Sequence, residues 1–347
     1  MILAGSFIKA FMCAFNGVFP IILLIVLGYF LKRKGFFSDE FLNKGNSFVF
    51  KVCLPCLLFI NVYAIESFSE IDWKVVIYSE LALLLFFSIG ILIVKLFIEE
   101  DKQKGVVLQC IVRSNYAIIG IPLAAAFGGE AGEQVAAILG AFSIPTLNVF
   151  AVLALSVFIK KDGEKISLKS TIIKICKNPL IIGVVLGLLV IGIRSLIPTN
   201  ELGELAFSLE RDLPFIYKAI KNISSIASPL ALFILGGKFS FNAVKGMLKQ
   251  ISIGVLARIV VVPATAIFLA VILDKTNVFM FDNPQAVFPA FIALFGSPVA
   301  VSSAIMAQDM DNDGVLAGQL VVWTSVFSIL TIVILVTTLG MLGYIAI

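Results

Sequence analysis

The chain has 347 residues, of which 60% are hydrophobic and 14% charged, and its mean hydropathy is +1.08. Soluble globular proteins have about 45–50% apolar and about 25% charged residues, so this composition excludes a soluble enzyme, a disordered chain and a nucleic-acid-binding protein. The net charge of +4 indicates an orientation signal rather than a polyanion-binding surface. Without any histidine, histidine metal ligands and general bases are excluded. We therefore expect a membrane protein that is not an enzyme and needs no metal and no cofactor.

The apolar residues gather in ten stretches, each near the length of about 20 residues that a helix needs to cross a bilayer. The stretches are residues 9–31, 43–65, 73–98, 105–128, 133–159, 178–197, 214–237, 245–273, 285–308 and 313–345. Basic residues follow the first stretch instead of preceding it, so we interpret it as a retained helix and not as a signal peptide. The sequence predicts an all-α polytopic membrane protein with about ten transmembrane helices.

Lysine and arginine are unequally divided between the two sets of connecting loops. One side of the membrane collects 16 of them and the other 7, while Lys51, Arg113 and Arg258 lie inside apolar stretches. Because cytoplasmic loops carry the basic excess, we expect the richer side to be cytoplasmic. Both termini would then lie outside a plasma membrane, and residues 160–177 would form a cytoplasmic linker.

Proline and glycine motifs recur at an offset of five stretches. The matched sets are Pro20 and Gly28 with Pro179 and Gly187, Pro55 with Pro229, and Gly120 and Pro122 with Gly296 and Pro298. Since five is odd, the two halves must have opposite orientations in the membrane, which is typical of transporters built from inverted repeats. We expect two inverted five-helix repeats, at residues 1–159 and 178–347.

The fourth and ninth stretches are the pair that we expect to be broken within the membrane. Proline lacks an N–H group and clashes with the preceding turn, so Pro122 predicts a break near Gly120 and Pro298 predicts a second one. Such breaks at matching positions mark the binding sites of inverted-repeat transporters. The helix N-termini after the breaks would favour an anionic ligand. The alternative is two kinked helices without a ligand.

Within residues 114–122, Asn115 stands seven residues before Pro122, and a Gly-Ile pair directly precedes the proline. This pattern resembles the fourth-helix crossover signature of the auxin efflux carrier family of membrane transporters. Residues 177–179, 229–237 and 307–309 resemble the bacterial permease branch of that family. The resemblance implies two five-helix repeats and an elevator-type exchange between a transport domain and a scaffold domain. It also implies a small organic anion as the substrate, either an auxin-like carboxylate or a dicarboxylate.

Two other kinds of transport protein are alternatives. One is a sodium-coupled carrier similar to the bile-acid symporters, and the other is a channel. The crossover stretches contain no carboxylate before Asp309, which favours proton coupling or no ion coupling over sodium coupling. The lipid bilayer and the anion are the expected partners, and proton coupling and a homodimer are left open.

Eight residues are candidates for the substrate site: Arg113, Asn115, Gly120, Pro122, Asn148, Pro298, Ser302 and Ser303. The Asn115 amide can both donate and accept hydrogen bonds. The Arg113 guanidinium suits a carboxylate, although the side chain could instead reach the cytoplasmic face. The family resemblance implies a polar residue at Asn148 beside the crossover, and one serine hydroxyl after Pro298 could reach the same ligand.

Lys51 and Glu80 are candidates for a coupling pair. A lone charge is costly in lipid and consecutive helices are usually neighbours, so we expect the two side chains to face each other. Such a pair could bind and release a proton, or it could be a static pair that fixes helix packing. For Arg258 we expect a structural partner. We interpret Gly183 and Gly187 as a close-packing face.

Overall fold

The computed structural model describes residues 2–63, 72–159, 177–196, 207–276 and 280–345. The linker predicted at 160–177 therefore lies outside the described residues, except for Lys177. Within the described ranges the secondary structure is helical apart from one isolated β-bridge. Among the described residues, six helical segments are long and apolar enough to cross a membrane: Asp39–Tyr63, Trp73–Phe97, Tyr116–Val157, Pro214–Lys238, Leu248–Lys275 and Gly314–Met341. Shorter apolar helices cover Pro179–Arg194 and Pro284–Gly296.

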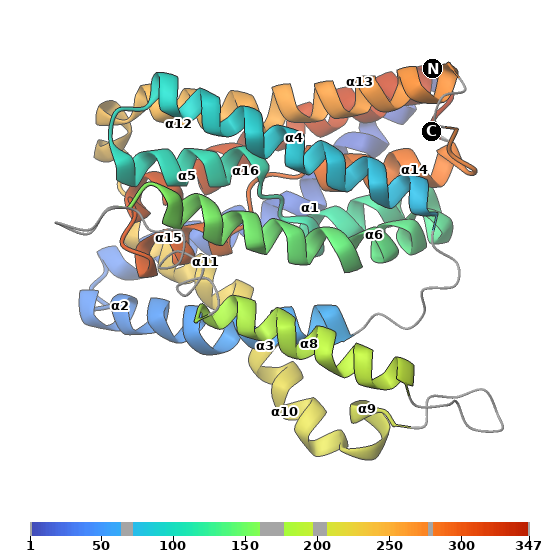
Figure 1. The fold of residues 1–347 in the computed structure, drawn as a ribbon. Helices are drawn as coiled ribbons and strands as arrows, with labels where there is room; N and C mark the ends of the chain where they lie inside the picture. The colour runs from blue at the N-terminus through green and yellow to red at the C-terminus, as the bar shows by residue number, and fades with distance from the viewer. Residues whose placement is uncertain (1, 64–71, 160–176, 197–206, 277–279, 346–347) are drawn as a thin grey trace.

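The helices are arranged in two layers (Figure 1). The upper layer holds α4 (Trp73–Phe97), α5 (Asp101–Val112), α6 (Ile121–Val157), α12 (Leu248–Leu256), α13 (Val262–Lys275), α14 (Pro284–Phe291) and α16 (Gly314–Met341). The lower layer holds α2 (Asp39–Phe48), α3 (Leu54–Tyr63), α8 (Pro179–Leu196), α9 (Leu209–Asp212) and α10 (Pro214–Ser225). Between the layers lie α11 (Ala227–Lys238) and α15 (Ser302–Asp309), while α1 (Ile2–Arg33) packs along both α11 and α16.

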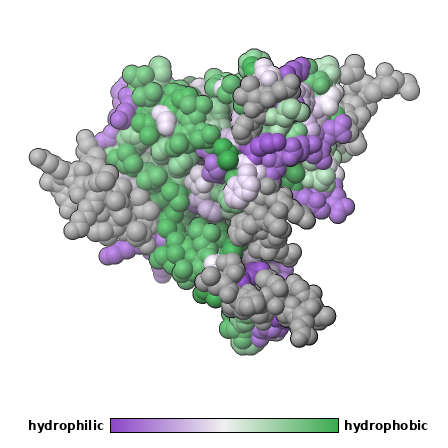
Figure 2. Space-filling model, turned by 45° about the vertical axis from the view of Figure 1, so that its right-hand side comes forward, coloured by the Kyte–Doolittle hydropathy of each residue, from purple (hydrophilic) through white to green (hydrophobic). Residues whose placement is uncertain are grey.

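Large apolar side chains cover much of the outer surface. Leu96 is 77% exposed, and Leu92 and Phe268 are each more than half exposed. Figure 2 shows a broad, continuous hydrophobic face with hydrophilic residues gathered toward its margins. Monomeric soluble proteins rarely expose apolar patches beyond a few hundred Å². This surface is suited to contact with the hydrocarbon core of a bilayer.

The segment Tyr116–Val157 folds back on itself at Gly129. Gly129 has φ 61° and ψ −155°, a conformation that residues with a Cβ rarely adopt. The Tyr116 hydroxyl donates to the carbonyl oxygen of Ala136, 2.7 Å away, although the two residues would be about 30 Å apart in a straight helix. The segment therefore contains two antiparallel helical parts, where the sequence predicts two separate spans.

Helix α8 packs closely along α3 through small residues, which confirms the packing face predicted at Gly183 and Gly187. A Cβ added at Gly183 would lie 2.5 Å from the carbonyl oxygen of Pro55, and one at Gly187 would lie 2.7 Å from the Val62 side chain. Small residues allow two helix backbones to approach each other in a membrane. The contact joins two helices of the lower layer.

We expect Gly183→Ala to lower the free energy of unfolding by about 1–3 kcal/mol, because the new methyl group would meet backbone that cannot rotate away. Gly192→Ala on the same helix is the matched control, since a Cβ at Gly192 meets nothing within 4 Å. Thermal unfolding of both purified variants in one detergent checks this prediction. Equal unfolding temperatures for the two variants would contradict the close packing of α8 on α3.

Candidate functional site

The first helix interruption lies at residues 113–115. Helix α5 ends at Val112, Arg113 is extended, and the helix resumes with the π-helical turn η2 (Tyr116–Gly120), which continues into α6. The break predicted near Gly120 is wrong, because Gly120 has helical dihedral angles of φ −64° and ψ −56°. The π-helical turn widens the helix just before Pro122, and in this way it accommodates a residue that lacks an N–H group.

The second interruption follows η5 (Ile292–Gly296) and contains Pro298, as the sequence predicts. Ser297 is extended, and the helix resumes as α15 at Ser302. The two interruptions lie antiparallel to each other, with a β-bridge between Ser114 and Val299. The backbone N–H of Asn115 donates to the carbonyl oxygen of Pro298 at 2.8 Å. Two broken helices therefore cross at one point, as the matched motifs suggest.

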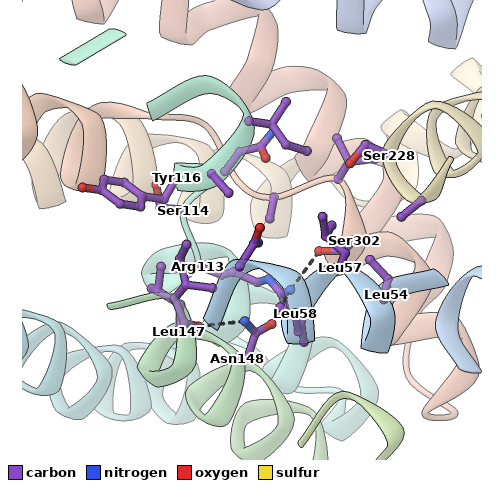
Figure 3. A pocket seen from close by; sticks show the side chains of 18 of the residues that line it. Leu54, Leu57, Leu58, Arg113, Ser114, Tyr116, Leu147, Asn148, Ser228 and Ser302 are labelled. Atoms are coloured by element: carbon purple, nitrogen blue, oxygen red, sulfur yellow. Dashed lines mark hydrogen bonds between the residues drawn. The ribbon is translucent and has the colours of Figure 1, made fainter. Parts of the chain in front are cut away.

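A cavity opens at this crossing, between the two helix layers (Figure 3). It contains about 630 Å³ of empty space, part of which is open to the outside. The crossing contributes residues 113–118 and 300–302, and α6 contributes Ile144, Leu147 and Asn148. The other wall comes from the lower layer and α11: Leu54, Leu57, Leu58, Asn61, Leu180, Ala227, Ser228 and Ala231.

Arg113 is the cation in the wall of this cavity. Its side chain is only 6% exposed, so it does not extend to the membrane surface. The guanidinium Nη2 donates to Asn148 Oδ1 and to Ser302 Oγ, each at 2.8 Å (Figure 3). Nη1 contacts the Met306 sulfur. Within the described residues no carboxylate forms an ion pair with Arg113. A buried positive charge without a counter-ion therefore borders the cavity.

Two helix N-termini face the same cavity. The first residues of η2, from Tyr116 to Ile118, line it, and so does Ser302 at the start of α15. The first N–H groups of a helix lack intrahelical partners and carry the positive end of the helix dipole. Asn115 is 4% exposed, and its side-chain nitrogen has no hydrogen-bond partner. Donors and positive charge therefore converge on one wall, which suits an anion.

Four of the predicted site residues, Arg113, Asn115, Asn148 and Ser302, line the cavity. The other four do not line it: Pro298 lies in the second interruption and Ser303 in the first turn of α15, whereas Gly120 and Pro122 lie in the helix that follows the first interruption. Sequence reasoning missed the polar residues of the opposite wall, Asn61 and Ser228. The signal that could have found them is a polar side chain inside an apolar stretch that contains one of the repeated prolines, Pro55 for Asn61 and Pro229 for Ser228.

The structure does not bring Lys51 and Glu80 together. Lys51 is exposed in the lower layer, in the π-helical turn η1 (Val49–Cys53), whereas Glu80 is half-buried in the upper layer. The Glu80 carboxylate accepts a hydrogen bond from the Ser143 hydroxyl at 2.9 Å. The expectation of a facing pair is wrong because α3 packs on α8 while α4 packs on α5 and α6, so these consecutive helices belong to different layers. A coupling role for either residue stays a prediction.

Comparison with known proteins agrees with this architecture. The model of a family described as membrane transport proteins matches residues 13–336. Over 326 residues the chain is 24% identical to a protein described as an uncharacterized transporter from Methanocaldococcus jannaschii, and the alignment covers 91% of this chain and 95% of that protein. The family consists of multi-pass membrane transporters and not of enzymes. The chain belongs to this membrane transport protein family, which is the auxin efflux carrier family.

Proposed function

We propose that this protein is a secondary transporter that carries a small organic anion across the plasma membrane. The observation that supports it most strongly is the Arg113 guanidinium, which is buried at the helix crossing without a carboxylate partner and borders a cavity. An isolated buried charge is costly, and a bound anion would supply the missing counter-charge. A carboxylate matches the planar fork of a guanidinium and can form two parallel hydrogen bonds with it.

The cavity wall favours a monocarboxylate with an apolar body over a dicarboxylate. Among the described residues that line this cavity, Arg113 is the one basic side chain, and most of the others are leucine, isoleucine and alanine. A second carboxylate would have to lose its water against apolar side chains without gaining a cation, which is unfavourable. An aromatic or aliphatic monocarboxylate places its charge at Arg113 and its apolar part against the leucines of α3.

We further propose ten membrane spans in two inverted repeats, at residues 1–159 and 178–347, with both termini outside. The recurring proline motifs and the antiparallel crossing of the two interruptions support this arrangement. In the elevator mechanism proposed here, the upper layer with α15 is the transport domain and the lower layer with α1 and α11 is the scaffold. The cavity lies between these two layers, where relative sliding would expose it to each side in turn.

Transport by purified protein in liposomes tests this function. We expect uptake of radiolabelled indole-3-acetate, an aromatic monocarboxylate, to exceed uptake of malate by about tenfold or more, because one misplaced buried charge costs more than 1.4 kcal/mol. Imposed sodium or pH gradients separate a sodium-coupled or proton-coupled carrier from a uniporter. Protein-free liposomes provide the control, and no uptake of any monocarboxylate or dicarboxylate above that control would contradict the proposal.

A further inference from the structure

Arg258 is a second buried cation at the helix crossing, and the proposed anion site does not use it. It lies in the π-helical turn η4 (Ala257–Val261) and is 0% exposed. No ion pair involves it in the part of the chain that the structure describes. The expected structural partner exists, but it is a set of backbone carbonyl groups and not a carboxylate.

All three guanidinium nitrogens of Arg258 donate to these carbonyl groups. Nε and Nη2 donate to the carbonyl oxygen of Ser297 at 3.0 and 2.8 Å, and Nη2 also donates to that of Leu294 at 3.0 Å. Nη1 donates to the carbonyl oxygens of Val112 at 3.1 Å and Ile111 at 3.4 Å. Four oxygens from two separate helices therefore surround one cation.

These oxygens belong to the C-terminal ends of the two half-helices. Ile111 and Val112 are the last residues of α5, Leu294 lies in η5, and Ser297 directly follows η5. The last carbonyl groups of a helix have no intrahelical partner and carry the negative end of the helix dipole. The crossing is thus polarised: its N-terminal ends and Arg113 face the cavity, while its C-terminal ends face Arg258.

In transporters with broken helices, unwound carbonyl groups and half-helix C-terminal ends hold a coupling cation such as sodium. Here a guanidinium that belongs to the chain already occupies such a set of oxygens. We infer that Arg258 is a tethered cation that replaces a free coupling cation at the crossing, so that the anion site is ordered without sodium. The anion part of this inference depends on the proposed function.

The contacts of Arg258 also explain how it would order the anion site. Val112 directly precedes Arg113, and Ser297 directly precedes Pro298. The carbonyl oxygen of Pro298 accepts a hydrogen bond from the backbone N–H of Asn115. By fixing the carbonyl groups of Val112 and Ser297, Arg258 holds both interruptions in register. It is therefore a positioning residue for Arg113 and Asn115, without contact with the ligand.

The first test compares sodium chloride with choline chloride at equal ionic strength. For the wild-type protein we expect the same affinity for indole-3-acetate and the same unfolding temperature in both salts. For Arg258→Ala we expect a loss of affinity of about a hundredfold or more in choline, because the carbonyl groups left without a donor would no longer hold Arg113 and Asn115 in place. Sodium or methylguanidinium, at a non-denaturing concentration, should restore much of that affinity and raise the unfolding temperature of the variant.

Arg113→Ala is the matched control, because it also removes a buried arginine at the crossing but should gain no response to sodium. A saturable sodium requirement in the wild-type protein would overturn the inference, and this measurement needs no variant to fold. Normal binding of the anion by Arg258→Ala in choline chloride would also overturn the inference. The unfolding temperatures are measured without any organic anion, so a failure of the proposed function would leave the test of the cation site intact.

Discussion

Arg113→Ala is expected to weaken anion binding by about 2–5 kcal/mol, a loss of about 30-fold to several thousandfold, because it removes one partner of a buried charge pair. The change also frees Asn148 and Ser302, which each accept a hydrogen bond from the same guanidinium nitrogen. The affinity of Arg113→Lys should fall between that of the wild type and that of Arg113→Ala, since an ammonium group keeps the charge but loses the planar fork. Equilibrium binding of radiolabelled indole-3-acetate to purified protein measures the effect.

Arg194→Ala supplies the matched control for that experiment. Arg194 stacks on the Tyr63 ring and donates to the Tyr63 carbonyl oxygen at 3.2 Å, outside the cavity. Arg194→Ala removes the same kind of side chain without touching the proposed site, so the affinity for indole-3-acetate should be unchanged. If folded Arg113→Ala protein binds the anion as tightly as the wild type, Arg113 is not a ligand and the proposed site must be abandoned.

The sequence was sufficient to locate the helix crossing but not to define its local geometry. Pro298 lies in an extended interruption, as predicted from the chemistry of proline. Pro122 does not, because η2 widens the helix around it, and the chain instead breaks at residues 113–115. Whether a proline breaks a helix or is accommodated in it depends on the neighbouring turns, and tertiary packing decides which of the two occurs.

Contacts between distant segments explain the remaining successes and failures. Polar residues inside apolar stretches are costly to bury alone, so the sequence marks Arg113 and Asn148 as residues that need polar partners, and in the structure they bond to each other beside the cavity. The wrong pairing of Lys51 with Glu80 could have been avoided only by knowing that α3 and α4 belong to different layers, which helix order alone does not indicate. For the same reason, sequence analysis did not identify the lower-layer wall of the cavity.

The contacts between the layers provide a direct test of the elevator mechanism. Near one end of the interface, the Ser47 hydroxyl of α2 donates to the Asp309 carboxylate of α15 at 2.9 Å. Close by, the Asn46 side chain donates to the carbonyl oxygen of Ile305 at 3.3 Å. If α15 moves with the upper layer, as proposed, these bonds must break in every transport cycle.

A covalent link at this position should therefore stop transport. In a background where the five native cysteines are replaced, we expect Ser47→Cys combined with Asp309→Cys to lose most uptake of indole-3-acetate on oxidation and to regain it on reduction. Gln103→Cys combined with Asp313→Cys is the control, because those side chains are 3.1 Å apart within the upper layer and would move together. Mass spectrometry would show whether the cross-link between positions 47 and 309 has formed. Full uptake by the cross-linked protein would mean that the two layers do not slide past each other. The elevator mechanism would then have to be replaced by a local opening at the crossing.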